Sequence, residues 1–337
     1  MPHLVIKHWL NAFTGLYTPD PRAIGGLDSA SKFLYAARSV ILIISAQAAI
    51  IAGLLAAGDR AFHVEPFIGI LVGFVVAHML SNLSNDYFGY RRGHDLPDSP
   101  RMRYTVHPLA SGVLDQRTLL TGLAVLVVVG CSVAAAFVLA RGWLAAAFLV
   151  PGVALLLWYD ASPVPLKSVG LGEFAVLLVW GPLMIGGGYA MIVGHVSANA
   201  MFASVPYGLG VMTILVGKHI DKMQFDSQHR IRTLPVLLGA ERARALNIVS
   251  IGLMYVIVAA LVVSHRLTPF ALVAVIALPR GWRAVRTMSH PRPASPPAGY
   301  VGWPLWYSRT CHQHGRLFGW AYIAGLSAGV AWSAVLG

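Results

Sequence analysis

Long apolar segments separated by short polar ones make up most of this chain. A helix of about 20 apolar residues is long enough to cross the hydrocarbon core of a bilayer. Nine segments come close to this length: residues 37–57, 66–86, 117–140, 143–159, 171–193, 200–220, 243–264, 267–288 and 315–336. The pattern predicts an all-α membrane protein with nine transmembrane helices. Pro269 and Pro279 predict a kink in the eighth segment, which proline in a membrane helix permits.

The predicted helices divide the chain into two parts. Residues 37–337 form a nine-helix transmembrane domain. Residues 1–36 contain no span and form a cytoplasmic N-terminal segment. Within it, His3 to Phe13 has the alternation of apolar and polar positions that is typical of a helix lying on the membrane surface.

The composition and the placement of charge support a membrane protein and exclude a nucleic-acid-binding one. Of 337 residues, 57% are hydrophobic and 11% are charged, whereas about 25% charged residues is usual in soluble domains. The net charge of +12 comes from loops on one side of the predicted membrane. Counted along the nine crossings, that side holds 22 Lys and Arg residues, and the other side holds only Arg60, Arg141 and Arg266. Because basic loops face the cytoplasm, the N-terminus is predicted to be cytoplasmic and the C-terminus external. The excess of Arg over Lys favours a bacterial cell membrane as the location.

Two polar stretches follow the second and sixth apolar segments, on the predicted cytoplasmic side. In the first, Asn82 and Asp86 are four residues apart and share one face of a helix. In the second, Asp221 and Asp226 are five residues apart, roughly 140° around a helix, so irregular backbone is expected near residues 223–225. Carboxylate and amide oxygens together with substrate phosphates suit Mg²⁺. The plain alternative is that these are ordinary polar residues where helices leave the membrane.

Basic residues beside the acids indicate an anionic ligand as well as a metal. They are Arg91, Arg92, Lys218 and Lys222, joined by Lys167 of the third cytoplasmic loop. A pure cation site would not favour these neighbours, whereas a Mg²⁺–diphosphate site requires them to neutralise the remaining phosphate charge. For Arg91 and Arg92, anchoring at the cytoplasmic face is an alternative role.

Four other residues have simpler interpretations. Glu173 opens the fifth span and is interpreted as a favourable acid at a helix N-terminus. His312 and His314 are interpreted as surface residues, and Cys131 as a small core residue.

Several motifs, in order along the chain, resemble those of one family. They are Asn82 to Asp95, His107 to Gly112, Tyr159 to Glu173, Trp180 to Pro182, and Asp221 to Asp226 with Arg232 to Gly239. Over residues 35–265 the chain resembles the UbiA superfamily of intramembrane prenyltransferases, particularly its 1,4-dihydroxy-2-naphthoate prenyltransferase branch. It departs from that pattern at Gly89, where the family has a further Asp, and in the five-residue gap of the second motif, where the family gap is four.

The resemblance implies a fold in which the nine transmembrane helices surround a central cavity capped by cytoplasmic loops. It also implies a function: Mg²⁺-dependent transfer of a prenyl group from a polyprenyl diphosphate to an aromatic acceptor. It implies metal ligands Asn82, Asp86, Asp221 and Asp226, diphosphate-binding residues Arg91, Arg92, Lys167, Lys218 and Lys222, and a further catalytic residue, Tyr159. Tyr159, Trp180 and Tyr189 are candidates to shield a carbocation. Two alternatives remain open: cyclisation of a prenyl diphosphate, which would suit the departures, and transport of a lipid or small molecule.

Overall fold

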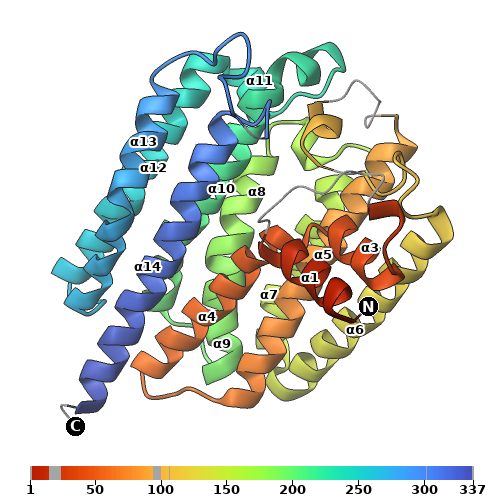
Figure 1. Ribbon diagram of the computed structural model, residues 1–337. Helices are drawn as coiled ribbons and strands as arrows, with labels where there is room; N and C mark the ends of the chain where they lie inside the picture. Colours follow the sequence, from red (N-terminus) through yellow and green to blue (C-terminus); the bar gives the residue numbers. More distant parts are fainter. Residues whose placement is uncertain (1, 15–23, 94–99, 106, 301, 336–337) are drawn as a thin grey trace.

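All regular structure in the described residues is helical. The computed structural model describes residues 2–14, 24–93, 100–105, 107–300 and 302–335, and Figure 1 shows their arrangement. The N-terminal half contains α1 (Pro2–Thr14), α3 (Ser29–Ala36), η1 (Ser39–Ile41), α4 (Ile43–Gly58), α5 (Val64–Arg91), η2 (Pro100–Arg103), α6 (Gln116–Arg141), α7 (Trp143–Asp160) and η3 (Leu166–Ser168). The C-terminal half contains α8 (Gly172–Leu178), η4 (Val179–Gly186), α9 (Gly187–Val193), α10 (Ala198–Gln228), α11 (Leu234–Leu238), α12 (Ala240–Val263), η5 (Pro269–Ala277), α13 (Leu278–Met288) and α14 (Tyr307–Val335).

Eight helical stretches in the described part of the chain are long and apolar enough to cross a membrane. They correspond to eight of the nine predicted spans. The exception is residues 267–288, where the 3₁₀ helix η5 is followed by the short helix α13. Pro269 and Pro279 each stand at the start of one of these pieces, since proline fits the first turn of a helix but breaks its interior. A single ninth span is therefore not confirmed.

The fifth span is bent between α8 and α9. Between α8 and α9 the chain forms the π-helical turn η4, and Gly181 there has non-helical angles (φ −95°, ψ −105°). A Cβ atom on Gly208 of α10 would lie 3.0 Å from the Cα atom of Gly181 and 2.8 Å from the carbonyl oxygen of Leu177. The bend thus accompanies close contact between this span and α10, which only glycine at position 208 permits.

Helix α10 lies at the centre of the bundle and α6 at its edge. Of the residues in the most apolar 18-residue stretch of each helix, 67% are buried in α10 and 6% in α6. Cys131 of α6 is exposed, so its interpretation as a core residue was wrong. Between α4, α10 and α14 there is a cavity of about 10 Å³, lined by Gln47, Tyr207 and neighbouring apolar residues. Such a cavity has room for about one water molecule.

The amphipathic N-terminal stretch is helical, as expected. In α1, Trp9, Leu10 and Phe13 are exposed, and the amide of Asn11 donates to the hydroxyl oxygen of Tyr35 on α3 (2.8 Å). An apolar face that is exposed in this way suits contact with a membrane surface.

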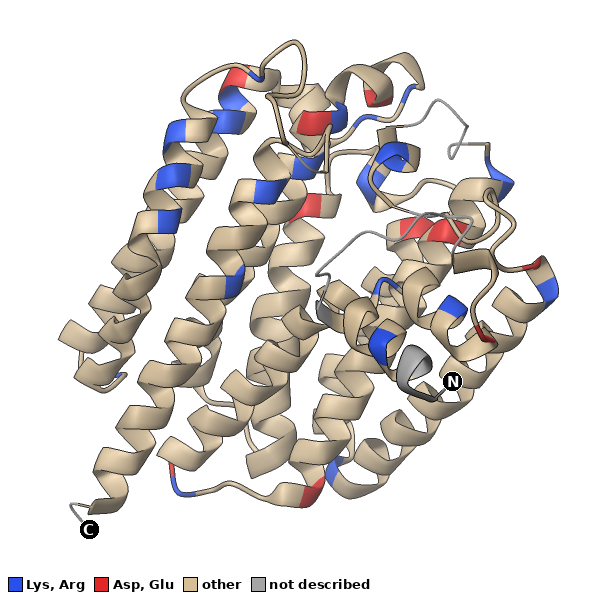
Figure 2. Ribbon diagram, in the orientation of Figure 1, with Lys and Arg blue, Asp and Glu red and all other residues tan. Residues whose placement is uncertain are grey.

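Most charged residues gather at one end of the bundle (Figure 2). This end contains the C-terminal ends of α5 and α10, the N-terminal end of α14 and the loops beside them. The two polar stretches therefore lie at the same end of the molecule. One expectation about them was wrong: α10 continues as a regular helix to Gln228, without irregular backbone at residues 223–225.

Candidate active site

Asp86 is the centre of the first polar cluster. Its side chain is fully buried near the end of α5, and Arg38 and Arg101 both form ion pairs with it, the second at 2.6 Å. Arg38 has a left-handed backbone conformation (φ 56°) just before η1, which is unusual for a residue other than glycine. Such conformations persist where the surrounding structure enforces them, often at functional sites.

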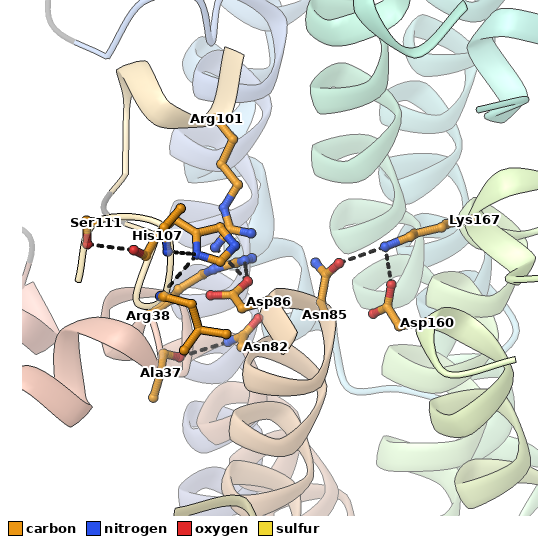
Figure 3. A network of polar contacts seen from close by, with 12 residues as sticks. Ala37, Arg38, Asn82, Asn85, Asp86, Arg101, His107, Ser111, Asp160 and Lys167 are labelled. Atoms are coloured by element: carbon orange, nitrogen blue, oxygen red, sulfur yellow. Dashed lines mark hydrogen bonds and ion pairs between the residues drawn. The ribbon is translucent and has the colours of Figure 1, made fainter. Parts of the chain in front are cut away.

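The neighbouring amides of α5 connect this cluster to two other segments (Figure 3). The amide of Asn82 donates to the carbonyl oxygen of Ala37 (3.0 Å). Asn85 accepts a hydrogen bond from the Lys167 ammonium (2.7 Å), which also forms an ion pair with Asp160 at the end of α7. Asn82 and Asp86 share a face as predicted, while Asn85 points toward Lys167.

A second set of charged residues forms one face of α10. Lys218, Lys222 and Asp226 are successively four residues apart and so line up along the helix. The Lys222 ammonium is 3.3 Å from the Asp226 carboxylate, whose side chain is 1% exposed. Neither carboxylate oxygen of Asp226 has a hydrogen-bond partner in the described residues. A buried carboxylate without donors is costly, so this residue is suited to binding a cation.

Asp221 faces a different neighbour, the N-terminus of α14. Its two carboxylate oxygens accept hydrogen bonds from the backbone N–H groups of Tyr307 (3.1 Å) and Ser308 (2.9 Å). Gly217, one turn earlier, makes this possible, because a Cβ atom there would lie 2.9 Å from the nitrogen of Ser308. A carboxylate at a helix N-terminus satisfies orphan donors and complements the helix dipole. The contacts of Asp221 thus give it a structural role.

The two clusters lie within electrostatic range of each other. Lys218 interacts electrostatically with Arg38, Arg101, Lys167 and Lys222. The basic side chains Arg38, Arg101, Lys167, Lys218 and Lys222 therefore converge from four separate segments. The carboxylates among them are Asp86, Asp160 and Asp226, so the site has excess positive charge and suits a multiply charged anion.

Tyr104 lies between the two clusters. Burial raises the pKa of its phenol, and the positive charges of Lys222, Arg101 and Arg38 oppose that shift. Its hydroxyl group is buried without a hydrogen-bond partner in the described residues. A neutral phenol with a free donor beside basic side chains can bind an anion directly.

The other predicted residues are more scattered. Arg91 is exposed, and Arg92 donates to the carbonyl oxygens of Asp160 and Ser162 (2.7 Å for the latter), so it stabilises the end of α7. Tyr159 lies next to Asp160, within electrostatic range of Arg38. The ring of Trp180 packs edge-on against His78 at 5.2 Å between centroids. Asp95 lies outside the described residues.

Tyr189 lies away from the site. It donates to Asp59 (2.5 Å), in the loop between α4 and α5 at the end of α5 opposite to Asp86. Its candidacy as a carbocation shield is therefore not supported by its position.

Two further interpretations change. Glu173 is fully buried and contacts Nδ1 of His219 at 2.6 Å, in addition to standing in the first turn of α8. His314 is fully buried and contacts the Tyr255 hydroxyl group at 2.8 Å, so its interpretation as a surface residue was wrong.

The residues that sequence reasoning missed are Arg38, Arg101 and Tyr104. Arg38 and Arg101 were counted only as basic residues that set the orientation. Arg38 precedes Asp86 by 48 positions, and no periodicity relates such distant residues. The one available signal was the number of basic residues close to the polar stretches.

The donor set fits a Mg²⁺ ion held mainly by substrate phosphates. In the part of the chain that the structure describes, no three His, Cys, Asp or Glu side chains form a metal-binding group. Each cluster does present one buried carboxylate with an oxygen that lacks a hydrogen-bond partner, on Asp86 and Asp226. Mg²⁺ is often bound by one or two carboxylates together with phosphates and water.

The fold and the site define a multi-pass helical membrane protein with a buried, positively charged site at one end of its bundle. Residues 46–309 match the model of the UbiA prenyltransferase family. The chain belongs to this family and is a UbiA-type prenyltransferase.

Sequence relatives support this assignment at low identity. The chain is 23% identical over 223 residues to 1,4-dihydroxy-2-naphthoate octaprenyltransferase of Bacillus subtilis, covering 65% of this chain and 70% of that one. It is 26% identical over 202 residues to UbiA prenyltransferase domain-containing protein 1 of Gallus gallus, covering 56% of each. The match therefore spans little more than half of the vertebrate relative.

Solved structures share the fold. A UbiA homologue from Aeropyrum pernix K1 has a TM-score of 0.64 at 17% identity, covering 87% of this chain and 98% of that one. A UbiA homologue from Archaeoglobus fulgidus, bound to DMAPP and Mg²⁺, has a TM-score of 0.58 at 14% identity, covering 88% and 99%.

Proposed function

We propose that this chain transfers a prenyl group from a polyprenyl diphosphate to an aromatic acceptor. The observation that carries the proposal is the group of five basic side chains around the buried carboxylates Asp86, Asp160 and Asp226. DMAPP, which is bound in the archaeal structure, and 1,4-dihydroxy-2-naphthoate, for which the bacterial enzyme is named, have the chemistry that this site suits.

The basic side chains bind the diphosphate. Lys218 and Lys222 approach it from α10, Lys167 from η3, and the guanidinium groups of Arg38 and Arg101 from the Asp86 cluster. Charge-assisted hydrogen bonds from these groups are short and strong. The Tyr104 hydroxyl group has an unused donor in the same region and adds a neutral hydrogen bond to a phosphate oxygen.

Mg²⁺ would be held by Asp86, Asp226 and the Asn82 side chain, and when bound it neutralises charge on the leaving diphosphate. Asp221 is left out of this set because both of its oxygens accept hydrogen bonds from α14.

The chemical step is heterolysis of the allylic C–O bond, in which the diphosphate leaves with the electron pair. The aromatic acceptor then attacks the allylic carbon and loses a proton.

The protein's contribution to this step is electrostatic. Lys222, Arg101 and their neighbours are fixed in advance and stabilise the negative charge that develops on the leaving group. Tyr159 and Trp180 present aromatic faces that can stabilise the allylic cation. Because the site lies at one end of a membrane-spanning bundle, the apolar tail of the substrate can remain in the bilayer.

The site is proposed to face the cytoplasm of a bacterial cell. The support for this orientation is the 22-to-3 distribution of basic residues between the two sides of the nine predicted crossings, which follows the positive-inside rule.

A product assay tests the function. Purified full-length protein in lipid nanodiscs is supplied with geranylgeranyl diphosphate or longer homologues, with and without 1,4-dihydroxy-2-naphthoate, and lipids are analysed by mass spectrometry. We expect a prenylated acceptor and release of diphosphate, both lost in EDTA and in Asp226→Asn. Glu241→Gln, an exposed acid of α12, is the matched control and should retain activity.

The acceptor-free sample distinguishes the main alternative. A cyclic hydrocarbon or alcohol formed without an acceptor would show that the chain is a cyclase and would contradict the transfer reaction. If no diphosphate is released from any prenyl donor, the proposal as a whole is wrong.

A further inference from the structure

A second polar cavity lies outside the active site, between α13, α14 and the loop at residues 289–306. Its volume is about 310 Å³, at the lower end of the range of small-molecule sites. The polar side chains that line it are Arg283 and Thr287 from α13, Tyr300 from the loop, and Arg309, Thr310 and Gln313 from α14. The two guanidinium groups and the Gln313 amide can donate hydrogen bonds to a ligand, whereas the hydroxyl groups of Thr287 and Thr310 already donate to backbone carbonyl oxygens.

The lining of this cavity includes two arginines and no acidic side chain, although Asp221 lies within electrostatic range of Tyr300. The sequence contains no Asp or Glu after Glu241, so none of the last 96 residues is acidic. Among the described residues, neither Arg283 nor Arg309 forms an ion pair, although the Arg309 guanidinium carbon lies 4.9 Å from the centroid of the Tyr300 ring. Arg283 is exposed and Arg309 is partly buried. Their positive charges are therefore available to an anion from outside the chain.

The cavity lies where the bundle would meet the lipid headgroups. Arg280, Arg283 and Arg286 are three residues apart on α13, and Figure 2 shows basic positions along this helix at the edge of the bundle. Trp282, between them, is 63% exposed. Exposed tryptophan together with arginine at the basic end of a membrane protein is typical of the membrane–water interface. Trp306 adds a second aromatic ring to the cavity.

We propose that this cavity binds the phosphate of an anionic phospholipid headgroup, with Arg283 and Arg309 as its main ligands. Guanidinium groups bind phosphate oxygens in a bidentate manner, and basic pockets between membrane helices on the cytoplasmic side suit such headgroups. A free phosphate shares the chemistry, but it lacks the acyl chains that the exposed apolar surface beside Trp282 can accommodate.

Occupancy would also stabilise the active site. The cavity wall includes Trp306 and Arg309, and the residues between them, Tyr307 and Ser308, donate hydrogen bonds to Asp221. Arg292, from the loop that forms another wall, donates to the Asp221 carbonyl oxygen (2.7 Å). A bound headgroup would therefore restrain residues 306–309, the segment through which Asp221 of α10 is held against the start of α14.

Native mass spectrometry of the full-length protein tests the proposal. The protein is released from detergent in the presence of phosphatidylglycerol, phosphatidylcholine or inorganic phosphate, and the bound fraction of each is measured. We expect phosphatidylglycerol to be retained at least about tenfold better than phosphatidylcholine, because one charge-assisted contact is worth about a tenfold change in affinity. The double variant Arg283→Gln with Arg309→Gln should lose that preference. Arg286→Gln, an exposed arginine of the same helix outside the cavity, is the matched control and should retain it.

A thermal measurement in the same samples provides a second readout. Phosphatidylglycerol should raise the melting temperature of the wild type and of Arg286→Gln but not of the double variant. Equal loss of binding in Arg286→Gln would overturn the proposal, since it would show a diffuse effect of charge. Two other outcomes would also overturn the assignment to a lipid headgroup. In one, phosphatidylcholine is retained as well as phosphatidylglycerol. In the other, inorganic phosphate at low millimolar concentration displaces phosphatidylglycerol. These outcomes do not depend on prenyl transfer and remain interpretable if the proposed function fails.

Discussion

Lys222 and Asp226 lie one helical turn apart on α10, with the Lys222 ammonium 3.3 Å from the Asp226 carboxylate. Residues four apart share a helix face, so the side chain that accompanies Asp226 toward the active site is a cation. Asp221 comes one residue before Lys222 and is therefore rotated by about 100° from it around the helix. Its carboxylate binds the N-terminus of α14 instead. A diphosphate bound at this helix would therefore meet the positive charge of Lys222 as well as that of a metal ion.

Replacing Lys222 tests this arrangement. In Lys222→Met we expect the KM for the prenyl diphosphate to rise about tenfold, because a charge-assisted contact of about 1.5 kcal/mol is lost. The Mg²⁺ concentration for half-maximal rate should fall, because the Asp226 carboxylate no longer has a competing cation beside it. Initial rates over a grid of both concentrations measure the two effects. Lys7→Met, at an exposed lysine of α1, is the control, and an unchanged KM in Lys222→Met would remove Lys222 from the diphosphate site.

The two aspartates of α10 should respond differently to substitution. We expect Asp226→Asn to lose most activity while its melting temperature changes little, because the carboxylate has no hydrogen-bond donor in the described residues and its ion pair with Lys222 is long, at 3.3 Å. Asp221→Ala should destabilise the fold by about 1–3 kcal/mol, because two backbone donors at the start of α14 lose their acceptor.

Thermal unfolding in detergent and turnover of the same samples separate these roles. The partial replacement Asp221→Asn, which keeps one acceptor oxygen, should recover part of the lost stability. If Asp221→Ala kept its melting temperature but lost all turnover, Asp221 would belong to the chemistry and its position at α14 would not describe its role.

The sequence predicted the elements that depend on local patterns. Eight spans follow from apolar length alone, and the shared face of Asn82 and Asp86 follows from their four-residue spacing. The bend at Gly181 and Pro182 also follows from local residue types. The region 267–288 could not be resolved in this way, because its apolar length suggested one span while its two prolines divide it into η5 and α13.

The active site was predicted less well, because its contacts are between distant residues. The spacing of Asp221 and Asp226 was expected to break α10 so that both could face one ligand. The structure keeps the helix intact and gives Asp221 a partner 86 residues further along the chain, at Tyr307. Likewise, the ion pairs of Asp86 with Arg38 and Arg101 join three segments, and only the folded arrangement of helices brings them together.

Tyr104 provides a test of the region between the two clusters. Tyr104→Phe removes a buried hydroxyl group without a hydrogen-bond partner, so we expect stability to stay the same or to rise by up to about 1 kcal/mol. If the hydroxyl group donates to the diphosphate, the KM for the prenyl diphosphate should rise about fivefold, which corresponds to about 1 kcal/mol. Because burial raises the pKa of this phenol above its usual value, the phenol is neutral at physiological pH, and the pH profile of the variant should match that of the wild type there. A lower melting temperature with unchanged KM would assign Tyr104 to packing alone.

The orientation in the membrane is open to a direct test. Arg103 is the last residue of η2, beside the active site, and Ser264 follows α12 at the opposite end of the bundle; both are exposed. Single cysteines are introduced at these positions in a background in which Cys131 and Cys311 are replaced by alanine. A membrane-impermeant maleimide applied to intact cells should label Ser264→Cys and leave Arg103→Cys unlabelled until the cells are permeabilised, because the basic end is proposed to face the cytoplasm. The reverse labelling would place the active site outside the cell. In that case the diphosphate donor would have to reach the site from the external face, and the 22-to-3 distribution of basic residues would need another explanation.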